Sequence, residues 1–142
     1  MRLLLSLIFL VSLISCNSSN GSQESKSSAP DAHFLNLETA VQRSSGSVSG
    51  YGFSLKGFLD TIAKTGAKTE WVADKADVWV LKITLDDPAT NSSNEMSFSF
   101  KKIGNQAAVI RYVDNGNEIP AYNLGVTVDQ VLTPFSKMIQ SK

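Results

Sequence analysis

The sequence predicts an α+β fold: a small single domain with an antiparallel sheet of four to five strands and helices packed on one face. Apolar residues three and four positions apart, the spacing typical of helices, occur near both ends of residues 31–142. Between them, successive segments alternate apolar and polar residues, as strands with one buried face do. Grouped strands flanked by helices favour this class over an alternating α/β arrangement.

Two helices are expected in the first part of the domain. Phe34, Leu37 and Val41 have helical spacing, and Asp31 precedes them as a candidate N-cap. The glycine- and serine-rich residues 44–54 are then expected to form a loop. The next segment has one continuous apolar stripe, with Ser54 as its N-cap, Gly66 just past its end, and the stripe residues Leu55, Phe58, Leu59, Ile62 and Ala63.

The strands are expected from residue 69 onward. Residues 77–85 have one apolar face and one half-apolar face, so this strand is expected to be central. Two further strands carry the alternating residues Met96, Phe98 and Phe100, then Ala108, Ile110 and Tyr112. Residues 114–117, Asp-Asn-Gly-Asn, predict a hairpin turn, and residues 69–73 and 118–122 are expected to be flanking strands.

The last element is expected to be a helix that begins at Thr127. Thr127 and Gln130 have the spacing of a capping box, and an apolar stripe of Val131, Phe135 and Met138 follows. Pro134 lies inside this segment, so it predicts either a kink or the start of a second helix.

Residues 1–15 have the pattern of a secretory signal peptide. Arg2 precedes an apolar run, Leu3 to Ile14, that is interrupted by two serines. This length matches the roughly 7–15 apolar residues of a signal peptide, whereas a membrane-spanning helix needs about 20.

The sole cysteine lies two residues after this run, in Leu13-Ile14-Ser15-Cys16. This tetrapeptide resembles the lipobox of bacterial lipoproteins. The resemblance implies that the signal peptide is cut between Ser15 and Cys16, that the Cys16 sulfur carries a diacylglyceryl group, and that the new amino terminus is often acylated. Because Asn17 follows the cysteine, the resemblance implies the outer membrane, facing the periplasm, in a double-membrane bacterium. In a single-membrane bacterium the domain would lie on the outer face of the cell membrane.

A tether is expected between the lipid and the folded domain. Residues 16–30 are rich in serine and asparagine and contain no large apolar side chain. Such a segment cannot offset the entropy lost on ordering, so disorder is expected. The fourteen residues after Cys16 would reach about 20 Å. The folded domain is expected to span residues 31–142.

The charge of the domain argues against nucleic acid as a partner. Residues 31–142 carry eleven Lys and Arg and twelve Asp and Glu, because Arg2, Lys26 and Glu24 precede them. Nucleic-acid binding proteins usually present a basic stripe, and no such stripe occurs here. The membrane is therefore expected to hold the protein through the lipid on Cys16 and not through charge.

Catalytic and metal-binding chemistry have few candidate residues. The single histidine, His33, lies at the start of the domain and is expected to be a solvated helix residue. No cofactor or catalytic residue is expected. No metal site is expected either, because the oxygen-rich stretches lack the spacing of a calcium loop. A carboxylate enzyme using two of Asp86, Asp87 and Glu95 remains an alternative.

Tyr51 and Phe53 form the one candidate contact site for a partner. They lie among glycines, and aromatic residues on such loops make economical contact surfaces. Burial of both rings in the core is the alternative.

The leading hypothesis is a lipid-anchored envelope protein with a non-catalytic binding or accessory role. Its partner would be another protein or a small apolar ligand. An inhibitor of an envelope or host hydrolase, or a mobile-element exclusion or immunity lipoprotein, is the alternative. An exposed aromatic loop would favour the inhibitor, an apolar pocket the ligand binder, and two carboxylates facing each other in a cleft the enzyme.

Overall fold

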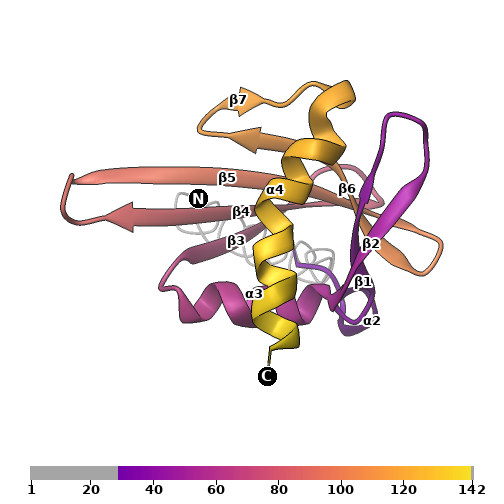
Figure 1. The fold of residues 1–142 in the computed structure, drawn as a ribbon, viewed down its shortest axis with the longest axis horizontal. Helices are drawn as coiled ribbons and strands as arrows, with labels where there is room; N and C mark the ends of the chain where they lie inside the picture. The colour runs from indigo at the N-terminus through magenta and orange to yellow at the C-terminus, as the bar shows by residue number, and fades with distance from the viewer. Residues whose placement is uncertain (1–28, 142) are drawn as a thin grey trace, which may run out of the picture.

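The computed structural model describes residues 29–141, which form a mixed sheet and three helices (Figure 1). In chain order the elements are α2 (Ala32–Leu35), β1 (Glu38–Gln42), β2 (Val48–Ser54), α3 (Leu55–Lys64), β3 (Lys68–Ala73), β4 (Val78–Asp87), β5 (Ser92–Ile103), β6 (Gln106–Asp114), β7 (Asn117–Glu118) and α4 (Ala121–Gln140).

The sheet has seven strands in the order β2-β1-β6-β5-β4-β3, with β7 paired to β6. All neighbours are antiparallel except β1 and β6, which are parallel. The α+β class is confirmed, but the predicted antiparallel sheet of four to five strands is wrong in size and in pairing. The strands that were missed are β1 and β2.

Strand β1 was missed because it is buried on both faces. Thr39, Ala40 and Val41 are all fully buried, so the segment lacks the alternation that marks a half-buried strand. The predicted helix is therefore reduced to the single turn of α2, which Asp31 does cap by accepting a hydrogen bond from the Phe34 backbone N–H at 2.9 Å.

Strand β2 replaces the predicted loop over residues 44–54. Its glycines serve close packing: a side chain at Gly50 would overlap the carboxylate of Glu38 in β1. That carboxylate accepts hydrogen bonds from the Gly52 backbone N–H at 2.9 Å and from the Gln106 side chain at 2.7 Å. Glu38 thereby links three neighbouring strands.

Helix α3 and the meander that follows it agree with the predictions. Ser54 caps α3 by accepting a hydrogen bond from the Gly57 backbone N–H at 3.0 Å, and Gly66 has a φ of +80° just after the helix. The hairpin between β6 and β7 is also confirmed, with positive φ at Asn115 and Gly116. A register shift near Ser99 changes which β6 residues face the core.

Helix α4 begins six residues earlier than Thr127, the predicted start. The predicted strand over residues 118–122 is wrong beyond Glu118, because β7 ends there and Pro120 precedes the first helical residue. The helix also runs through Pro134 without ending. Pro134 has no backbone N–H, so the helix loses one hydrogen bond there. Packing of the apolar face of α4 on the sheet offsets this loss.

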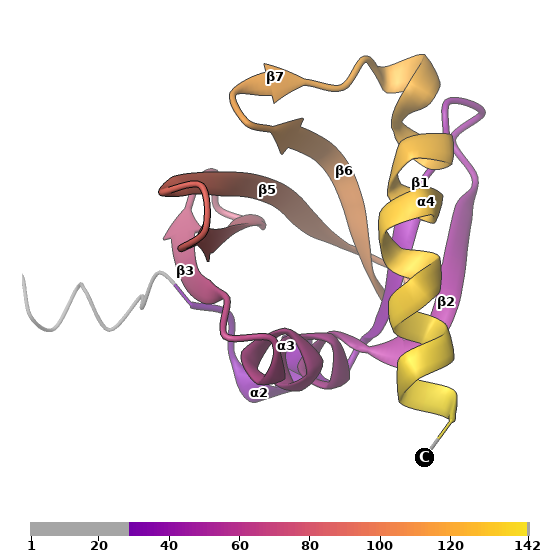
Figure 2. The same ribbon diagram turned by 60° about the vertical axis from the view of Figure 1, so that its left-hand side comes forward.

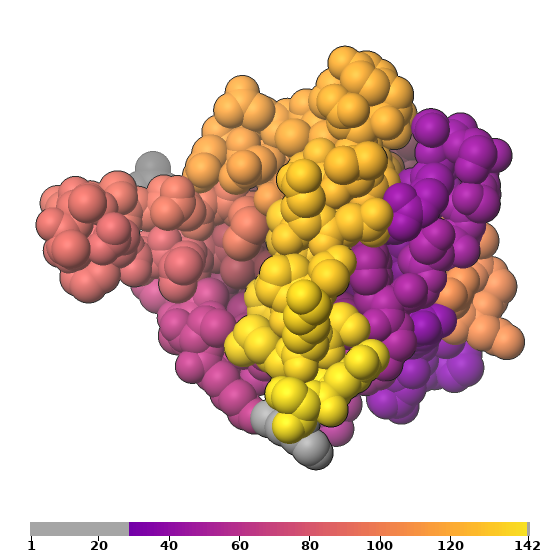
Figure 3. All heavy atoms as spheres, viewed as in Figure 1, coloured from indigo at the N-terminus to yellow at the C-terminus, as the bar shows by residue number. Residues whose placement is uncertain are grey.

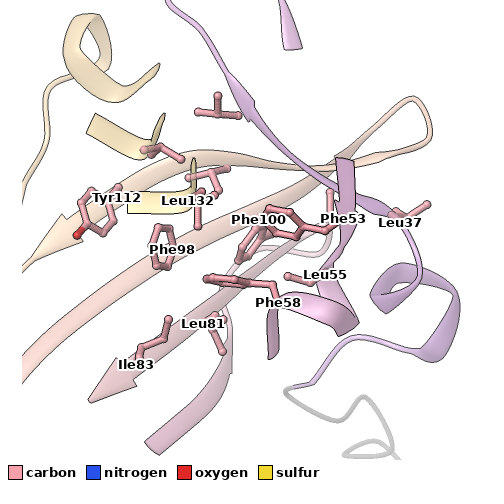
Figure 4. Packing of buried hydrophobic residues seen from close by; sticks show 14 of the residues in the cluster. Leu37, Phe53, Leu55, Phe58, Leu81, Ile83, Phe98, Phe100, Tyr112 and Leu132 are labelled. Atoms are coloured by element: carbon pink, nitrogen blue, oxygen red, sulfur yellow. The ribbon is translucent and has the colours of Figure 1, made fainter. Parts of the chain in front are cut away.

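The sheet curves around the helices, and the core lies on its concave side (Figure 2). Figure 4 shows this core, in which the rings of Phe58, Phe98 and Phe100 lie close together between α3 and the strands. The Phe58 and Phe98 rings meet edge to face, with centroids 6.0 Å apart.

A polar cluster fixes α4 to the β1–β2 end of the sheet. Asp129 of α4 accepts hydrogen bonds from the Tyr51 hydroxyl at 2.7 Å and from Arg43 at 3.0 Å. Ser136 of α4 donates to the Tyr51 backbone carbonyl at 3.0 Å. Burial and the carboxylate of Asp129 both raise the pKa of Tyr51, so this phenol stays protonated and remains a donor.

Candidate functional site

An apolar cleft lies where α3 and α4 meet strands β4 and β5. Its volume is about 140 Å³. Figure 3 shows α4 running across this side of the molecule, with the β4–β5 hairpin projecting beyond it at the left. Ten residues line the cleft: Phe58, Ile62 and Thr65 at α3, Ala67 before β3, Ile83 and Leu85 on β4, Met96 and Phe98 on β5, and Val131 and Phe135 on α4.

The periodicity of each element places its residues in the cleft. Phe58, Ile62 and Thr65 are four and three positions apart, so they share one face of the helical segment. Ile83 and Met96 lie directly opposite each other on the concave face of the sheet. Phe135 packs edge to face against Phe58, with ring centroids 5.0 Å apart, so the two helices meet at one wall of the cleft.

The cleft presents almost no polar group to an occupant. Its one polar lining residue, Thr65, donates its hydroxyl hydrogen to the Ile62 carbonyl at 2.6 Å. A charged or hydrogen-bonding ligand would lose its hydration here without gaining a partner, which is unfavourable. An apolar occupant meets no such penalty.

The size of the cleft limits the occupant to a group of about six carbon atoms. An engineered apolar cavity of about 150 Å³ is known to remain dry and to bind benzene, and the cleft here has a similar volume. Leu85 lines the cleft and is 42% exposed, so it marks the mouth towards solvent. A larger ligand would therefore place only one end inside.

Two other hollows are more polar. One, of about 240 Å³, lies between the β1–β2 turn and the start of α4, and includes Arg43, which is already bonded to Asp129. The other, of about 440 Å³, surrounds the β4–β5 turn from Asp86 to Ser93. Both are open to solvent and lack the continuous apolar lining of the cleft.

Tyr51 and Phe53 do not form an exposed loop. Phe53 is 5% exposed and belongs to the core, and Tyr51 is half-buried with its hydroxyl bonded to Asp129. Of the two alternatives for these aromatic residues, the structure supports the core. Their position on the paired strand β2 is the reason, because the segment predicted to be a loop packs against α4.

The three candidate carboxylates do not meet in a cleft. Asp86 and Asp87 are adjacent on β4, so their side chains point to opposite faces of the sheet. Asp86 is bonded to Lys68 at 3.2 Å, which lowers the pKa of this carboxyl group. Asp87 accepts a hydrogen bond from the Ala89 backbone N–H in the turn, and Glu95 is exposed on the face that carries Asp86.

Several other predicted residues can be placed. His33 is exposed in α2. Within residues 29–141, no three His, Cys, Asp or Glu side chains gather as metal ligands would. The helices in the same range are too short or too polar to cross a membrane. Ser15 and Cys16, with the signal peptide and nearly all of the tether, lie outside the described residues.

Comparisons with protein-family models, with curated proteins and with solved structures find no match to this chain.

Proposed function

We propose that this chain is a lipid-anchored envelope protein that binds a small apolar ligand in the cleft between α3, α4 and the β4–β5 strands. In this proposal the lipid on Cys16 holds the domain at the membrane, facing the periplasm or the cell exterior, and the role is non-catalytic. The cleft, with its apolar lining and its volume of about 140 Å³, is the observation that carries the binding role.

The physical properties of the cleft set the expected affinity. Burial of an apolar group the size of a leucine or phenylalanine side chain contributes about 1.5–3 kcal/mol. This is less than the roughly 4 kcal/mol that corresponds to a 1 mM dissociation constant. A ligand held by the cleft alone therefore binds weakly. Tighter binding requires contacts beyond Leu85, on the surface outside the mouth.

The alternative role, as a hydrolase inhibitor or an exclusion lipoprotein, has less support. An exposed aromatic loop would have favoured the inhibitor, but Phe53 is buried and Tyr51 is bonded to Asp129. The ligand-binding role is preferred because the apolar pocket expected for it is present.

The binding proposal is tested with toluene as the probe. Titration of the full chain, followed by NMR, is expected to shift the signals of Ile62, Ile83 and Met96, which line the cleft, and to leave that of Val126 unchanged. Leu85→Asp places a charge at the mouth and is expected to weaken binding about tenfold or more. Val126→Asp is the matched control, because Val126 is 60% exposed on α4 and does not line the cleft. Shifts absent from these residues or spread evenly over the surface, or equal weakening by both variants, would contradict the proposal.

The anchor is tested by replacing Cys16. Cells expressing the chain are labelled with radioactive palmitate and then fractionated. The parent chain is expected to carry label and to sediment with membranes, whereas Cys16→Ser is expected to carry none, because a hydroxyl cannot form the thioether. Label that persists in Cys16→Ser would refute lipid attachment at this residue and leave the toluene result unaffected.

A further inference from the structure

Strand β3 forms one edge of the sheet. It is the last strand in the sheet order, and its residues Thr69 and Ala73 are exposed. At the opposite end of the sheet, Ser136 and Asp129 of α4 bond to Tyr51 of β2. Figure 2 shows α4 beside β1 and β2, and β3 at the other end of the sheet.

The backbone groups that point outward from β3 follow from its register with β4. The Asp74 N–H donates to the Val78 carbonyl at 3.3 Å, and the antiparallel register continues from there to Lys68 opposite Thr84. Because bonded and non-bonded pairs alternate, the backbone groups of Lys68, Glu70 and Val72 bond to β4. Those of Thr69, Trp71 and Ala73 point away, and no hydrogen bond from the described residues reaches them.

We propose that β3 pairs with β3 of a second copy of this chain, antiparallel and centred on Trp71. Trp71 then lies opposite its own copy, and Thr69 lies opposite Ala73 of the second copy. In this register the outward-pointing N–H and C=O groups of one β3 lie opposite the outward-pointing groups of the other β3, so the two strands can form hydrogen bonds. The pairing is closed by two-fold symmetry, because the same edge, β3, is used by both copies.

The charges along β3 select this register. When Trp71 is at the centre, Lys68 lies opposite Asp74 of the second copy, and symmetry repeats this ion pair. The neighbouring registers with the same hydrogen-bond alternation are centred on Glu70 or on Val72. The first places Glu70 opposite Glu70, and the second places Glu70 opposite Asp74 twice. Like charges directly opposite each other destabilise a strand pair, whereas opposite charges stabilise it.

The matched residues also define how the two copies face. Lys68 and Asp74 lie on the same, convex face of the sheet, so the two-fold axis is perpendicular to the sheet. Equivalent points of both copies then lie at the same height along this axis. Both copies can therefore be anchored in the same membrane. This last point rests on the proposed anchor, but the pairing itself does not.

Cysteine cross-linking of two co-expressed full chains, oxidised after purification with copper phenanthroline, tests the register independently of where the protein lies in the cell. One tagged copy carries Glu70→Cys and a differently tagged copy carries Val72→Cys. Residues 70 and 72 form a non-hydrogen-bonded pair in the proposed register, with Cα atoms about 4.5 Å apart, which suits a disulfide. A disulfide joining the two tags is expected. The control pair, Lys82→Cys with Thr84→Cys, lies on the interior strand β4. Equal cross-linking in the control, or none in the β3 pair, would overturn the proposal.

Charge reversal gives an independent test that leaves the core intact. Lys68→Asp and Asp74→Lys each place like charges opposite each other twice, so each is expected to weaken dimerisation of the detergent-solubilised full chain roughly tenfold. The double variant restores opposite charges and is expected to recover the dimer, as measured by light scattering. Lys68 also forms an ion pair with Asp86 of its own chain. Lys68→Asp breaks this pair and the double variant leaves it broken, so recovery of the dimer in the double variant cannot come from this pair. A monomeric parent chain, or a double variant no better than the single ones, would refute the pairing.

Discussion

Replacing Thr39 with valine should stabilise this protein, although it removes a polar group from the sheet. Thr39 lies in β1 opposite Ala107 and is 0% exposed. Its hydroxyl has no hydrogen-bond partner among the described residues. A buried hydroxyl without a partner costs about 1–3 kcal/mol relative to its hydrated state in the unfolded chain.

Valine keeps the β-branched shape of threonine and replaces the hydroxyl with a methyl group. We expect the free energy of unfolding of Thr39→Val to rise by about 1–2 kcal/mol. For a domain of this size, the midpoint of thermal unfolding should then rise by about 4–8 °C. The assay is urea and thermal unfolding of the full chain, followed by circular dichroism.

Thr61→Val is the matched control. Thr61 is also buried, at 8% exposed, but its hydroxyl donates to the Gly57 carbonyl at 2.9 Å. Valine there removes a formed hydrogen bond, so the free energy of unfolding should fall by about 0.5–1.5 kcal/mol. If Thr39→Val were neutral or destabilising, the hydroxyl would have a partner in solution, and the reasoning would fail.

Two further predictions concern the core and the strand β2. Burial, with a smaller effect of Asp114, raises the pKa of Tyr112 from 10.0 to about 12. Because the phenol of Tyr112 has a higher pKa in the folded chain than in the unfolded chain, its contribution to stability is fully present below pH 10. This contribution is lost as the pH rises through about 12. The free energy of unfolding, measured in urea, should therefore decrease between these pH values, and decrease less in Tyr112→Phe; equal decreases would contradict this. Gly50→Ala should displace the Glu38 carboxylate and lower the free energy of unfolding by about 1–3 kcal/mol. The cost should nearly vanish in a Glu38→Ala background, and an undiminished cost would mean that strain elsewhere is responsible.

The elements that the sequence predicted well are those specified by neighbouring residues. Helix α3 has its N-cap Ser54, one apolar stripe and Gly66 within a dozen residues, so its signals need no distant partner. The β6–β7 turn depends on Asn115 and Gly116, whose positive φ values the turn requires. The alternation in β4 and β5 likewise reflects one face that packs on the helices and one that is more exposed over most of its length.

The elements that were predicted wrongly depend on partners far away in the chain. Residues 38–42 form a strand because β6, far along the chain, pairs with them in parallel and other residues bury both faces. Gly50 and Gly52 look like loop residues, but they allow the Glu38 carboxylate to lie against β2. The start of α4 was placed too late because Thr127 has the pattern of a cap, yet the helix already begins at Ala121.

The cleft likewise combines features set by neighbouring residues with a feature set by residues distant in the chain. Phe58, Ile62, Met96, Phe98 and Phe135 were all assigned to apolar faces from their spacing, and they do face inward. Their spacing could not show that two helices and two strands meet with about 140 Å³ left between them. That volume depends on how closely the elements approach each other.

The sequence by itself determined the α+β class, the caps and stripe of α3, the β4–β6 strands and the turn after them, and the expectation of a lipid anchor at Cys16. Only the tertiary structure decided the size and mixed pairing of the sheet, the burial of Phe53 and the presence of an apolar cleft. The physical reason is the range of the interactions. Caps, turns and periodicity act over a few residues, whereas strand partners and the gaps between packed elements are set by residues distant in the chain.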